Sequence, residues 1–249
     1  MKILLSGLKG FMGQEVQKLC NTGVRNAQLC AGVDFKADGT EGVPCAASFE
    51  NAETNIDCVI DFSHFSLTES LLDFCVKHRL PLVLATTGHT DAQKELIKKA
   101  ASEIPIFYAA NYSLGIALLV ELAKQTAAAF PEADIEIVET HHNRKVDAPS
   151  GTALAIFDAI KQVRDNAIKK LGRSGISKRS PEEIGIHAVR MGNITGIHEV
   201  IVGTQNQTIT LKHEAHSRAL FAEGALAAAQ YIIKKGPGLY NMKDLIDNK

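Results

Sequence analysis

The sequence predicts an α/β protein in which a doubly wound parallel sheet is followed by a second α+β domain with a mixed sheet. Up to about Asn111, short β-branched runs alternate with stretches of helical spacing, as in a parallel sheet covered by helices. A glycine loop, Gly7–Gly13, separates the first run from the first helical stretch. After Ser113 the alternation ends, and three strand-like runs joined by polar connections indicate a partly antiparallel sheet.

The first part contains five predicted strands, each a short apolar run bounded by polar or turn residues. They are Ile3–Ser6, Leu29–Val33, Cys58–Phe62, Leu82–Ala85 and Ile104–Tyr108. Helical spacing predicts helices between them at 12–19, 67–76 and 91–102. Thr90 precedes the last of these, with Gln93 three residues further on, which is the pattern of a capping box.

The second part begins with a long helix that we expect to extend to Ala129. The other elements predicted there are a strand at 135–140, a helix from 152 to about 170, and strands at 184–189, 198–203 and 208–213. A final helix, 217–235, stops at Gly236-Pro237 and is expected to return to the first sheet. We therefore predict a dinucleotide-binding domain at 1–112, a substrate-binding and oligomerisation domain at 113–216, and a returning C-terminal helix in 217–249.

Composition narrows the class of protein. The chain has 249 residues, of which 45% are hydrophobic and 22% charged, as in soluble globular proteins. With 27 Lys+Arg against 28 Asp+Glu, no global charge indicates nucleic acid or a membrane as partner. The five cysteines lack ligand-like spacing, so we expect reduced thiols and no metal site. Lys2 leads straight into a strand with no signal-like apolar region, and we expect a cytoplasmic protein.

The glycine loop predicts a nucleotide site. Gly7-Leu8-Lys9-Gly10-Phe11-Met12-Gly13 has the spacing G-x-x-G-x-x-G between a strand and a helix, as in a Rossmann-type domain. Glycines there allow a tight turn and close approach to a pyrophosphate; the alternative is an ordinary tight turn. Asp34 ends the second strand, where an acid accepts hydrogen bonds from the adenine ribose and disfavours a 2′-phosphate. Phe35 offers no cation, whereas Lys36 could meet such a phosphate, so both NADH and NADPH stay open, with NADH favoured.

Two further loops are candidates for cofactor contacts. Ala85-Thr86-Thr87-Gly88 follows the fourth strand, and Ala109-Ala110-Asn111-Tyr112 follows the fifth. Both lie at the carboxyl ends of predicted parallel strands, where open α/β sheets bind ligands. A plain turn is the alternative for each loop.

The stretch 139–154, ETHHNRKVDAPSGTAL, concentrates groups that handle protons and anions. Ser150, Gly151 and Thr152 open an apolar helical pattern, and the first N–H groups of a helix attract anions. Lys145 lies close by in sequence. We expect a carboxylate or phosphate to rest on this helix start.

His141 and His142 are adjacent at the end of the predicted strand. A strand alternates its side chains between two faces, so the two histidines should point apart and do different work. One histidine can pass protons, with Lys145 as a cation or second proton donor. A structural alternative is that both histidines only satisfy hydrogen bonds at the strand end. His198, His213 and His216 lie near the predicted strands of the second part and are weaker candidates.

These residues resemble one known family. Its hallmark E-x-H-H-x-x-K-x-D-x-P-S-G-T-A is met without a gap; the matching residues are Glu139, His141, His142, Lys145, Asp147, Pro149, Ser150, Gly151, Thr152 and Ala153. The glycine loop, Asp61-Phe62-Ser63, Thr86-Thr87-Gly88, Ala109-Ala110-Asn111, Glu183–Ile186, Arg190 with Gly192, and His213 with Ser217-Arg218 extend the match over nearly the whole chain. The sequence is similar to the 4-hydroxy-tetrahydrodipicolinate reductases (dihydrodipicolinate reductases) of the diaminopimelate route to lysine.

The resemblance implies roles for individual residues. His141 matches the family's proton donor and acceptor, Lys145 its proton-donating lysine, and His142, Gly151 and Thr152 its substrate contacts. Nicotinamide contacts are implied for Gly7, Leu8, Lys9, Gly10, Phe11, Met12, Asp34, Ala85, Thr86, Thr87, Ala109, Ala110, Asn111 and Tyr112. The family assembles as a homotetramer. The chain departs from the family at Phe35, where NADPH-preferring relatives tend to have arginine, and at Ala85 and Met191, where glycine is usual.

The reaction that the resemblance implies is reduction of a cyclic imino dicarboxylate by NAD(P)H, with water lost from the 4-hydroxy substrate. Two alternatives remain at the level of sequence. One is a dehydrogenase for another small imino or amino acid, and the other is a nucleotide-sensing module that binds nicotinamide without turnover.

Overall fold

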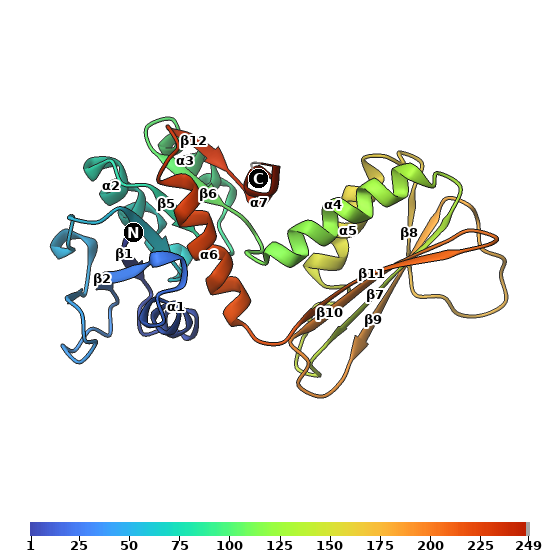
Figure 1. Cartoon of the computed structure of the whole chain (residues 1–249), viewed down its shortest axis with the longest axis horizontal. Coiled ribbons are helices and arrows are strands. Elements are labelled where there is room, and N and C mark those ends of the chain that lie inside the picture. Colours follow the sequence, from blue (N-terminus) through green and yellow to red (C-terminus); the bar gives the residue numbers. More distant parts are fainter. Residues whose placement is uncertain (248–249) are drawn as a thin grey trace. The chain divides into compact units, whose positions relative to one another are not determined.

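The computed structural model describes residues 1–247, which form two compact units (Figure 1). Unit 1 comprises Met1–Leu114 and the segment from Arg218 onward, and unit 2 comprises Gly115–Ser217. The predicted fold class is confirmed, because unit 1 contains a parallel sheet with helices and unit 2 a mixed sheet. The last two residues of the predicted range 217–249 lie outside the described residues.

Unit 1 is built on a seven-stranded sheet in which all pairings are parallel. Its strands are β1 (Lys2–Ser6), β2 (Gln28–Val33), β3 (Cys45–Ala46), β4 (Cys58–Asp61), β5 (Leu82–Leu84), β6 (Pro105–Tyr108) and β12 (Gly238–Tyr240). Their order is β12-β6-β5-β4-β1-β2-β3. After β1 the chain adds β2 and β3 on one side, and it then returns to the other side of β1 to add β4 and the remaining strands. Ligands of such sheets bind outside the carboxyl ends of the strands at this reversal.

Helices and short 3₁₀ turns connect these strands. The helices are α1 (Phe11–Asn21), α2 (Thr68–His78), α3 (Asp91–Ala101), α6 (Ala219–Ile232) and α7 (Met242–Asp247), and the 3₁₀ turns are η1 (Val24–Asn26), η2 (Phe49–Asn51) and η3 (Phe65–Leu67). The capping box predicted for α3 is present, since the Gln93 N–H donates to Thr90 Oγ1 at 3.2 Å and the Thr90 N–H to Gln93 Oε1 at 3.0 Å. Ile3, Leu4 and Leu5 of β1 are all fully buried, as expected where layers cover both faces of a parallel sheet.

Two edge strands of this sheet were missed by the sequence prediction. Strand β3 spans two residues and β12 three, which is too short for any periodicity to indicate a strand. Strand β12 follows α6, which the sequence predicted as the last helix at 217–235, and pairs in parallel with β6. The short helix α7 after β12 was also missed. The returning segment therefore contributes a strand as well as helices to unit 1.

Unit 2 contains a five-stranded mixed sheet in the order β11-β10-β7-β9-β8. The strands are β7 (Asp134–His141), β8 (Ile168–Leu171), β9 (Glu183–Arg190), β10 (Gly196–Gly203) and β11 (Thr208–Ala215). Strand β9 runs parallel to β7 and β8, and β10 runs antiparallel to β7 and β11. Helices α4 (Leu114–Ala129) and α5 (Gly151–Lys161) lie on one face of this sheet (Figure 1), where their apolar residues join those of β7, β9 and β10 in one core.

The helix predicted from 152 to about 170 is wrong in its second half. Helix α5 ends at Lys161, and Ile168–Leu171 form β8. The two apolar residues of the sequence Ile-Lys-Lys-Leu are three apart, which mimics helical spacing. Arg164 fixes the intervening turn by donating to the backbone carbonyls of Ala133, at 2.8 Å, and Phe130, and pairing with β9 then outweighs the local preference.

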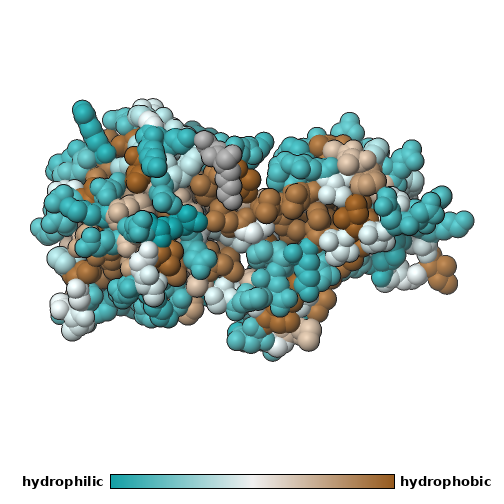
Figure 2. Space-filling view, viewed as in Figure 1, coloured by the Kyte–Doolittle hydropathy of each residue, from teal (hydrophilic) through white to brown (hydrophobic). Residues whose placement is uncertain are grey.

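Helix α4 is apolar on more than its core face. Figure 2 shows hydrophobic side chains gathered over this helix, where Leu118 is 48% and Leu122 38% exposed. Within residues 1–247, none of the helices combines the length and apolar character needed to cross a bilayer.

Helix α6 approaches the loop after β6 closely because residue 224 is glycine. A Cβ added at Gly224 would lie 1.6 Å from the Tyr112 carbonyl oxygen. We expect Gly224→Ala to destabilise the protein by about 1–3 kcal/mol, since the helix must shift away from this backbone. Thermal and urea denaturation would measure the loss. Gly236→Ala is the matched control, because a Cβ there meets nothing within 4 Å; equal midpoints for the two variants would contradict the close packing.

Candidate active site

Strand β7 carries Glu139 and His141 to the buried face of the unit 2 sheet. Alternate residues of this strand are buried, with Glu139 and His141 among them. His141 is 9% exposed, whereas His142 lies just beyond the strand and is half-buried. The His142 N–H donates to the Ile194 carbonyl at 2.8 Å, which holds the strand end in place.

Glu139 is the centre of the polar contacts on this face. Its side chain is fully buried, and its Oε2 lies 2.5 Å from His141 Nδ1. Arg190, opposite His141 on β9, binds both carboxylate oxygens, at 2.8 and 2.7 Å. The Ser150 N–H donates to Oε1 at 3.0 Å. Every oxygen of this buried carboxylate is therefore paired, as a buried charge requires.

These contacts set the protonation of the network. Burial opposes ionisation of Glu139, but the hydrogen bonds from His141 and Arg190 outweigh it and lower the pKa of Glu139 to about 2. An anionic Glu139 accepts a hydrogen bond from the His141 Nδ1–H, which leaves the other ring nitrogen, Nε2, for contact with a ligand. A Cβ added at Gly196 would lie 3.1 Å from His141 Nε2. Glycine at this position leaves that edge of the imidazole uncovered.

Helix α5 begins where the sequence places an anion site. Ser150 is its N-cap, and the Ser150 hydroxyl oxygen accepts from the Ala153 N–H at 3.2 Å. A Cβ at Gly151 would meet nothing within 4 Å, so the first helical residue faces open space. The helix start therefore combines a positive dipole end with an unobstructed backbone, which suits a carboxylate.

The loop between β7 and α5 places the cation predicted for this site. A tight turn brings the Lys145 N–H to the His142 carbonyl at 3.1 Å. Lys145 Nζ pairs with Asp147 at 2.8 Å, and Arg190 also donates to the Asp147 carbonyl at 2.7 Å. The ion pair with Lys145 lowers the pKa of Asp147. Arg190 thus links this loop, through Asp147, to the carboxylate of Glu139.

The glycine loop of unit 1 forms a close turn at the carboxyl end of β1. Gly7 has φ of 80°, and a Cβ there would lie 2.6 Å from the Phe62 carbonyl oxygen. A Cβ at Gly13 would lie 2.2 Å from the Gly7 carbonyl oxygen. Only glycine fits these two positions, so the backbone can approach a pyrophosphate at the start of α1.

Asp34 lies beside this loop. It is 8% exposed, and its two oxygens accept from the Lys9 and Lys36 N–H groups, both at 2.9 Å. A cavity of about 220 Å³ opens here, and the predicted cofactor residues that line it are Gly7, Lys9, Gly10, Asp34 and Lys36, with Phe35, Phe62, Ser63 and His64. Glycine backbone, a ribose-binding acid and two aromatic rings are the chemistry that an adenine nucleotide requires, so the residues present fit a nicotinamide dinucleotide.

The other predicted cofactor residues lie outside this cavity. Leu8 is fully buried, and Tyr112 is 3% exposed with its hydroxyl 2.9 Å from the Leu84 carbonyl oxygen, so both offer a ligand only their backbone. Thr86 donates to buried Asp61 at 2.6 Å. Phe11 is 61% exposed beneath the Arg218 guanidinium. Met12, Ala85, Thr87, Ala109, Ala110 and Asn111 are not brought to this cavity.

Comparison with known proteins decides the family. Residues 1–112 match the family model "Dihydrodipicolinate reductase, N-terminus", and 115–246 match "Dihydrodipicolinate reductase, C-terminus". The chain belongs to the dihydrodipicolinate reductase family. It is 42% identical to the 4-hydroxy-tetrahydrodipicolinate reductase of Clostridium novyi (strain NT), over 100% of this chain and 99% of the relative. Identity to that of Caldanaerobacter subterraneus subsp. tengcongensis is 43%, over 99% and 98%.

A solved structure agrees with this membership. Dipicolinate-bound dihydrodipicolinate reductase from Paenisporosarcina sp. TG-14 superimposes with a TM-score of 0.81 at 26% identity and covers 97% of each chain. As a member of the dihydrodipicolinate reductase family, the protein is an NAD(P)H-dependent oxidoreductase that reduces 4-hydroxy-tetrahydrodipicolinate in lysine biosynthesis through diaminopimelate. The comparisons therefore support the reductase over the two alternatives named above, a dehydrogenase for another small acid and a nucleotide-sensing module.

Two residues of the reductase site received no role from the sequence. Arg190 belongs to the family pattern, and His198 was only a weaker candidate. Each faces β7 in the sheet register, Arg190 opposite His141 and His198 opposite Glu139. The alternation of β10 puts His198 on the same buried face as Val200 and Val202, which is the signal in the sequence that could have indicated it.

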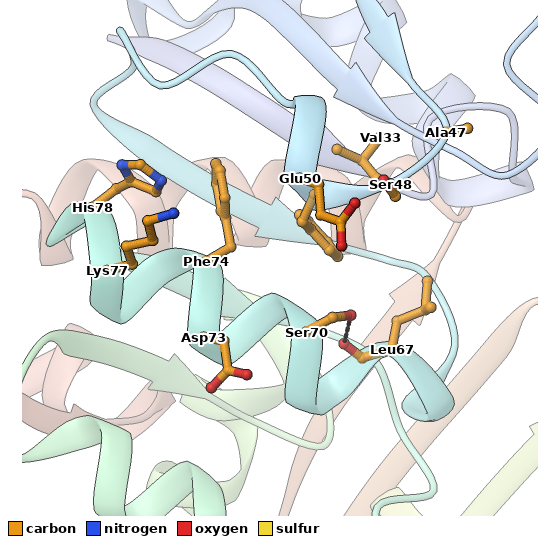
Figure 3. Close-up of a pocket in the computed structure, with 11 residues that line it drawn as sticks. Val33, Ala47, Ser48, Glu50, Leu67, Ser70, Asp73, Phe74, Lys77 and His78 are labelled. Carbon is orange, nitrogen blue, oxygen red and sulfur yellow. Dashed lines mark hydrogen bonds between the residues drawn. The ribbon is translucent and has the colours of Figure 1, made fainter.

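A second hollow adjoins the cavity at Asp34. It has a volume of about 450 Å³ between α2 and the β3–η2 segment, and it shares Val33 and Leu67 with the smaller cavity. Figure 3 shows Phe74 pointing from α2 toward that segment, with Lys77 and His78 further along the helix. Charged groups of both signs rim the hollow, so its lining selects no single kind of ligand.

Glu139 should make the stability of the reductase depend on pH. Its pKa is lowered from 4.5 to about 2, so the stabilisation is complete above pH 4.5 and is lost as the pH falls toward 2. Between about pH 5 and about pH 3.5, we expect the free energy of unfolding of wild type to approach that of Glu139→Gln by about 1–2 kcal/mol. Urea titrations at both pH values measure this. Glu136→Gln, on the outward face of β7, is the control; a constant gap between wild type and Glu139→Gln would contradict the lowered pKa.

Proposed function

We propose that His141 is the proton donor of the reduction, with Lys145 as the second proton-donating group and His142 and the start of α5 as the substrate holders. The observation that carries the proposal is the buried Glu139–His141 pair, joined through the Ser150 N–H to the start of α5. A proton donor and an anion site are thereby built on one rigid set of contacts. A reductase of an imino dicarboxylate needs both.

The reaction assigns a task to each group. When bound, the nicotinamide supplies hydride to the conjugated carbon of the substrate. The electron-rich enamine of the substrate that results must then take up a proton. His141 donates it from Nε2, and Glu139 balances the imidazolium charge before the transfer. Glu139 itself stays ionised because Arg190 binds both its oxygens.

The substrate holders act by geometry and charge. A carboxylate at Gly151 and Thr152 would accept from the first N–H groups of α5, with His142 and Lys145 as further donors. Ser150 is 2% exposed and its N–H is bound to Glu139, so it fixes the helix start on which the carboxylate rests. Lys145 is partly buried at 22% side-chain exposure, and its pairing with Asp147 keeps the ammonium at the loop. Holding the substrate in one orientation converts proton transfer into a reaction within a single complex.

We also propose that NADH is preferred over NADPH. Asp34 disfavours a 2′-phosphate, and Phe35 is 77% exposed where a guanidinium would otherwise meet that phosphate. Lys9 Nζ pairs with Asp38 at 2.6 Å and with Glu41 at 3.4 Å, so its charge is already compensated. Lys36 lies over the Phe35 ring at 5.2 Å and is the remaining cation of this cavity's lining.

Assembly and location belong to the same proposal. We propose that unit 2 forms a homotetramer through the face of its sheet that α4 and α5 leave open. Val138, Ile197 and Ile201 alternate onto that face and are half-buried in one chain. Apolar side chains on an open sheet face favour contact with another chain.

We place the enzyme in the cytoplasm, where its five free cysteines stay reduced.

Substitution of the proposed acids tests the roles. We expect His141→Ala to lower kcat by roughly 10²–10⁴-fold, the usual contribution of a positioned acid. Lys145→Ala should lower kcat and also raise KM, because it removes a cation from the carboxylate site. Oxidation of NADH and NADPH is followed with freshly generated 4-hydroxy-tetrahydrodipicolinate and with other imino acids.

The matched control is Lys124→Gln, since Lys124 donates to Gln162 at 2.8 Å on the helix side of the sheet, away from the face proposed for assembly. Affinity for NADH, measured by its fluorescence, should stay unchanged in all three variants. Wild-type rates in both His141→Ala and Lys145→Ala would overturn the assigned roles. Equal turnover of unrelated imino acids would count against the dipicolinate skeleton as substrate.

A second experiment tests the cofactor preference. Phe35→Arg adds a guanidinium for a 2′-phosphate, and Asp38→Asn with Glu41→Gln releases Lys9. Each change should raise kcat/KM for NADPH relative to NADH about tenfold, the effect of one charge-assisted hydrogen bond. Asp91→Asn, which removes an exposed carboxylate paired with Lys94, is the control. A higher kcat/KM with NADPH than with NADH in wild type would overturn the preference, and an unchanged ratio in both variants would overturn its assignment to these residues.

A further inference from the structure

A closed ring of buried contacts joins Glu139, His141, His198 and Ser150. Glu139 binds His141 Nδ1 through Oε2 and the Ser150 N–H through Oε1. His198 completes the ring, because its Nε2 lies 3.2 Å from Ser150 Oγ and its ring centroid 5.1 Å from that of His141. None of the four residues is more than 9% exposed. The His198 imidazole therefore contacts both the proposed acid and the residue that caps α5.

The two contacts of His198 use different parts of its ring. The planes of His198 and His141 are inclined at 75°, an edge-to-face arrangement that restricts rotation of the His141 imidazole. Nε2 meets the Ser150 hydroxyl, whose oxygen also accepts from the Ala153 N–H. We infer that His198 is a positioning residue that aligns His141 with the carboxylate-holding start of α5. This inference rests on the function proposed above.

The charge of His198 agrees with that role. Burial, together with nearby His141, lowers the pKa of His198 to about 4, although Glu139 acts in the opposite direction. The other charged or titratable groups that act on it are His213 and Lys145. At neutral pH, His198 is therefore an uncharged neighbour that does not oppose protonation of His141.

Stability alone gives a weak reason for a histidine at this position. Its Nδ1 is buried and makes no hydrogen bond among the described residues. An unpaired buried polar atom costs free energy, and an apolar ring of similar size would avoid that cost. The contact that an apolar ring cannot make is the hydrogen bond to Ser150. This is the contact that links the helix start to the rest of the ring.

Two substitutions separate the two contacts. His198→Phe keeps a ring against His141 but loses the hydrogen bond, and His198→Gln keeps a polar group within reach of Ser150 but loses the ring. We expect His198→Phe to raise the Kd of dipicolinate, used as the carboxylate probe, about tenfold while the pH profile of kcat stays in place. We expect His198→Gln to keep Kd within about threefold of wild type but to lower kcat and shift its pH profile.

Ser150→Ala removes the same hydrogen bond from the other side. It should raise the Kd of dipicolinate as much as His198→Phe does, and the double variant should add no further rise. This measurement also decides the matter if His198→Phe proves too unstable to assay. Lys124→Gln is again the control, and thermal denaturation of each variant shows that it is folded.

The outcomes are distinguishable from those of the proposed function. If His141→Ala keeps wild-type rates, the function proposed for His141 fails whatever His198 does. If His141→Ala is impaired but His198→Phe and His198→Gln leave both Kd and pH profile unchanged, only the positioning role fails. The positioning role would also fail if both His198 variants raised the Kd of dipicolinate and lowered kcat to the same extent. It would fail too if the effects of His198→Phe and Ser150→Ala on Kd were additive.

Discussion

The charge of one buried carboxylate determines the arrangement of the active site in unit 2. Glu139 is fully buried and accepts four hydrogen bonds, from His141, from two nitrogens of Arg190 and from the Ser150 N–H. A charge in this position is tolerated only if each bond is made, because an unpaired buried ion costs several kcal/mol. Strands β7 and β9 and the start of α5 must therefore keep their mutual positions, and the imidazole of His141 keeps its tautomer as a consequence.

In unit 1, the conformation of the glycine loop depends on positions that have no side chain. At Gly7 and Gly13 a Cβ would overlap backbone atoms, so the close turn depends on having no side chain there. Asp34 then ties the turn to the end of β2 by accepting from the Lys9 and Lys36 N–H groups. In both proposed binding regions, a carboxylate holds backbone groups in place: Glu139 holds the start of α5, and Asp34 holds the glycine loop.

Sequence reasoning succeeded where local chemistry and tertiary packing agree. The capping box at Thr90, the glycine loop and the alternation of β7 are all local patterns, and the structure contains each of them. It failed where distant partners decide. Residues 168–171 have helical spacing but form β8 because β9 offers a strand to pair with, and Gly238–Tyr240 form β12 because β6 has a free edge. Three or four residues carry too little pattern to predict such pairings.

The sequence by itself determined the fold class and the family, and it indicated the stretch 139–154 as the proposed place of the chemistry, because these depend on spacing along the chain. Only the tertiary structure decided which side chains surround His141. Arg190 and His198 come from strands about 50 and 60 residues further along, and they meet Glu139 through the register of β9 and β10. Register follows from the packing of a whole sheet face against its core, and no local pattern contains it.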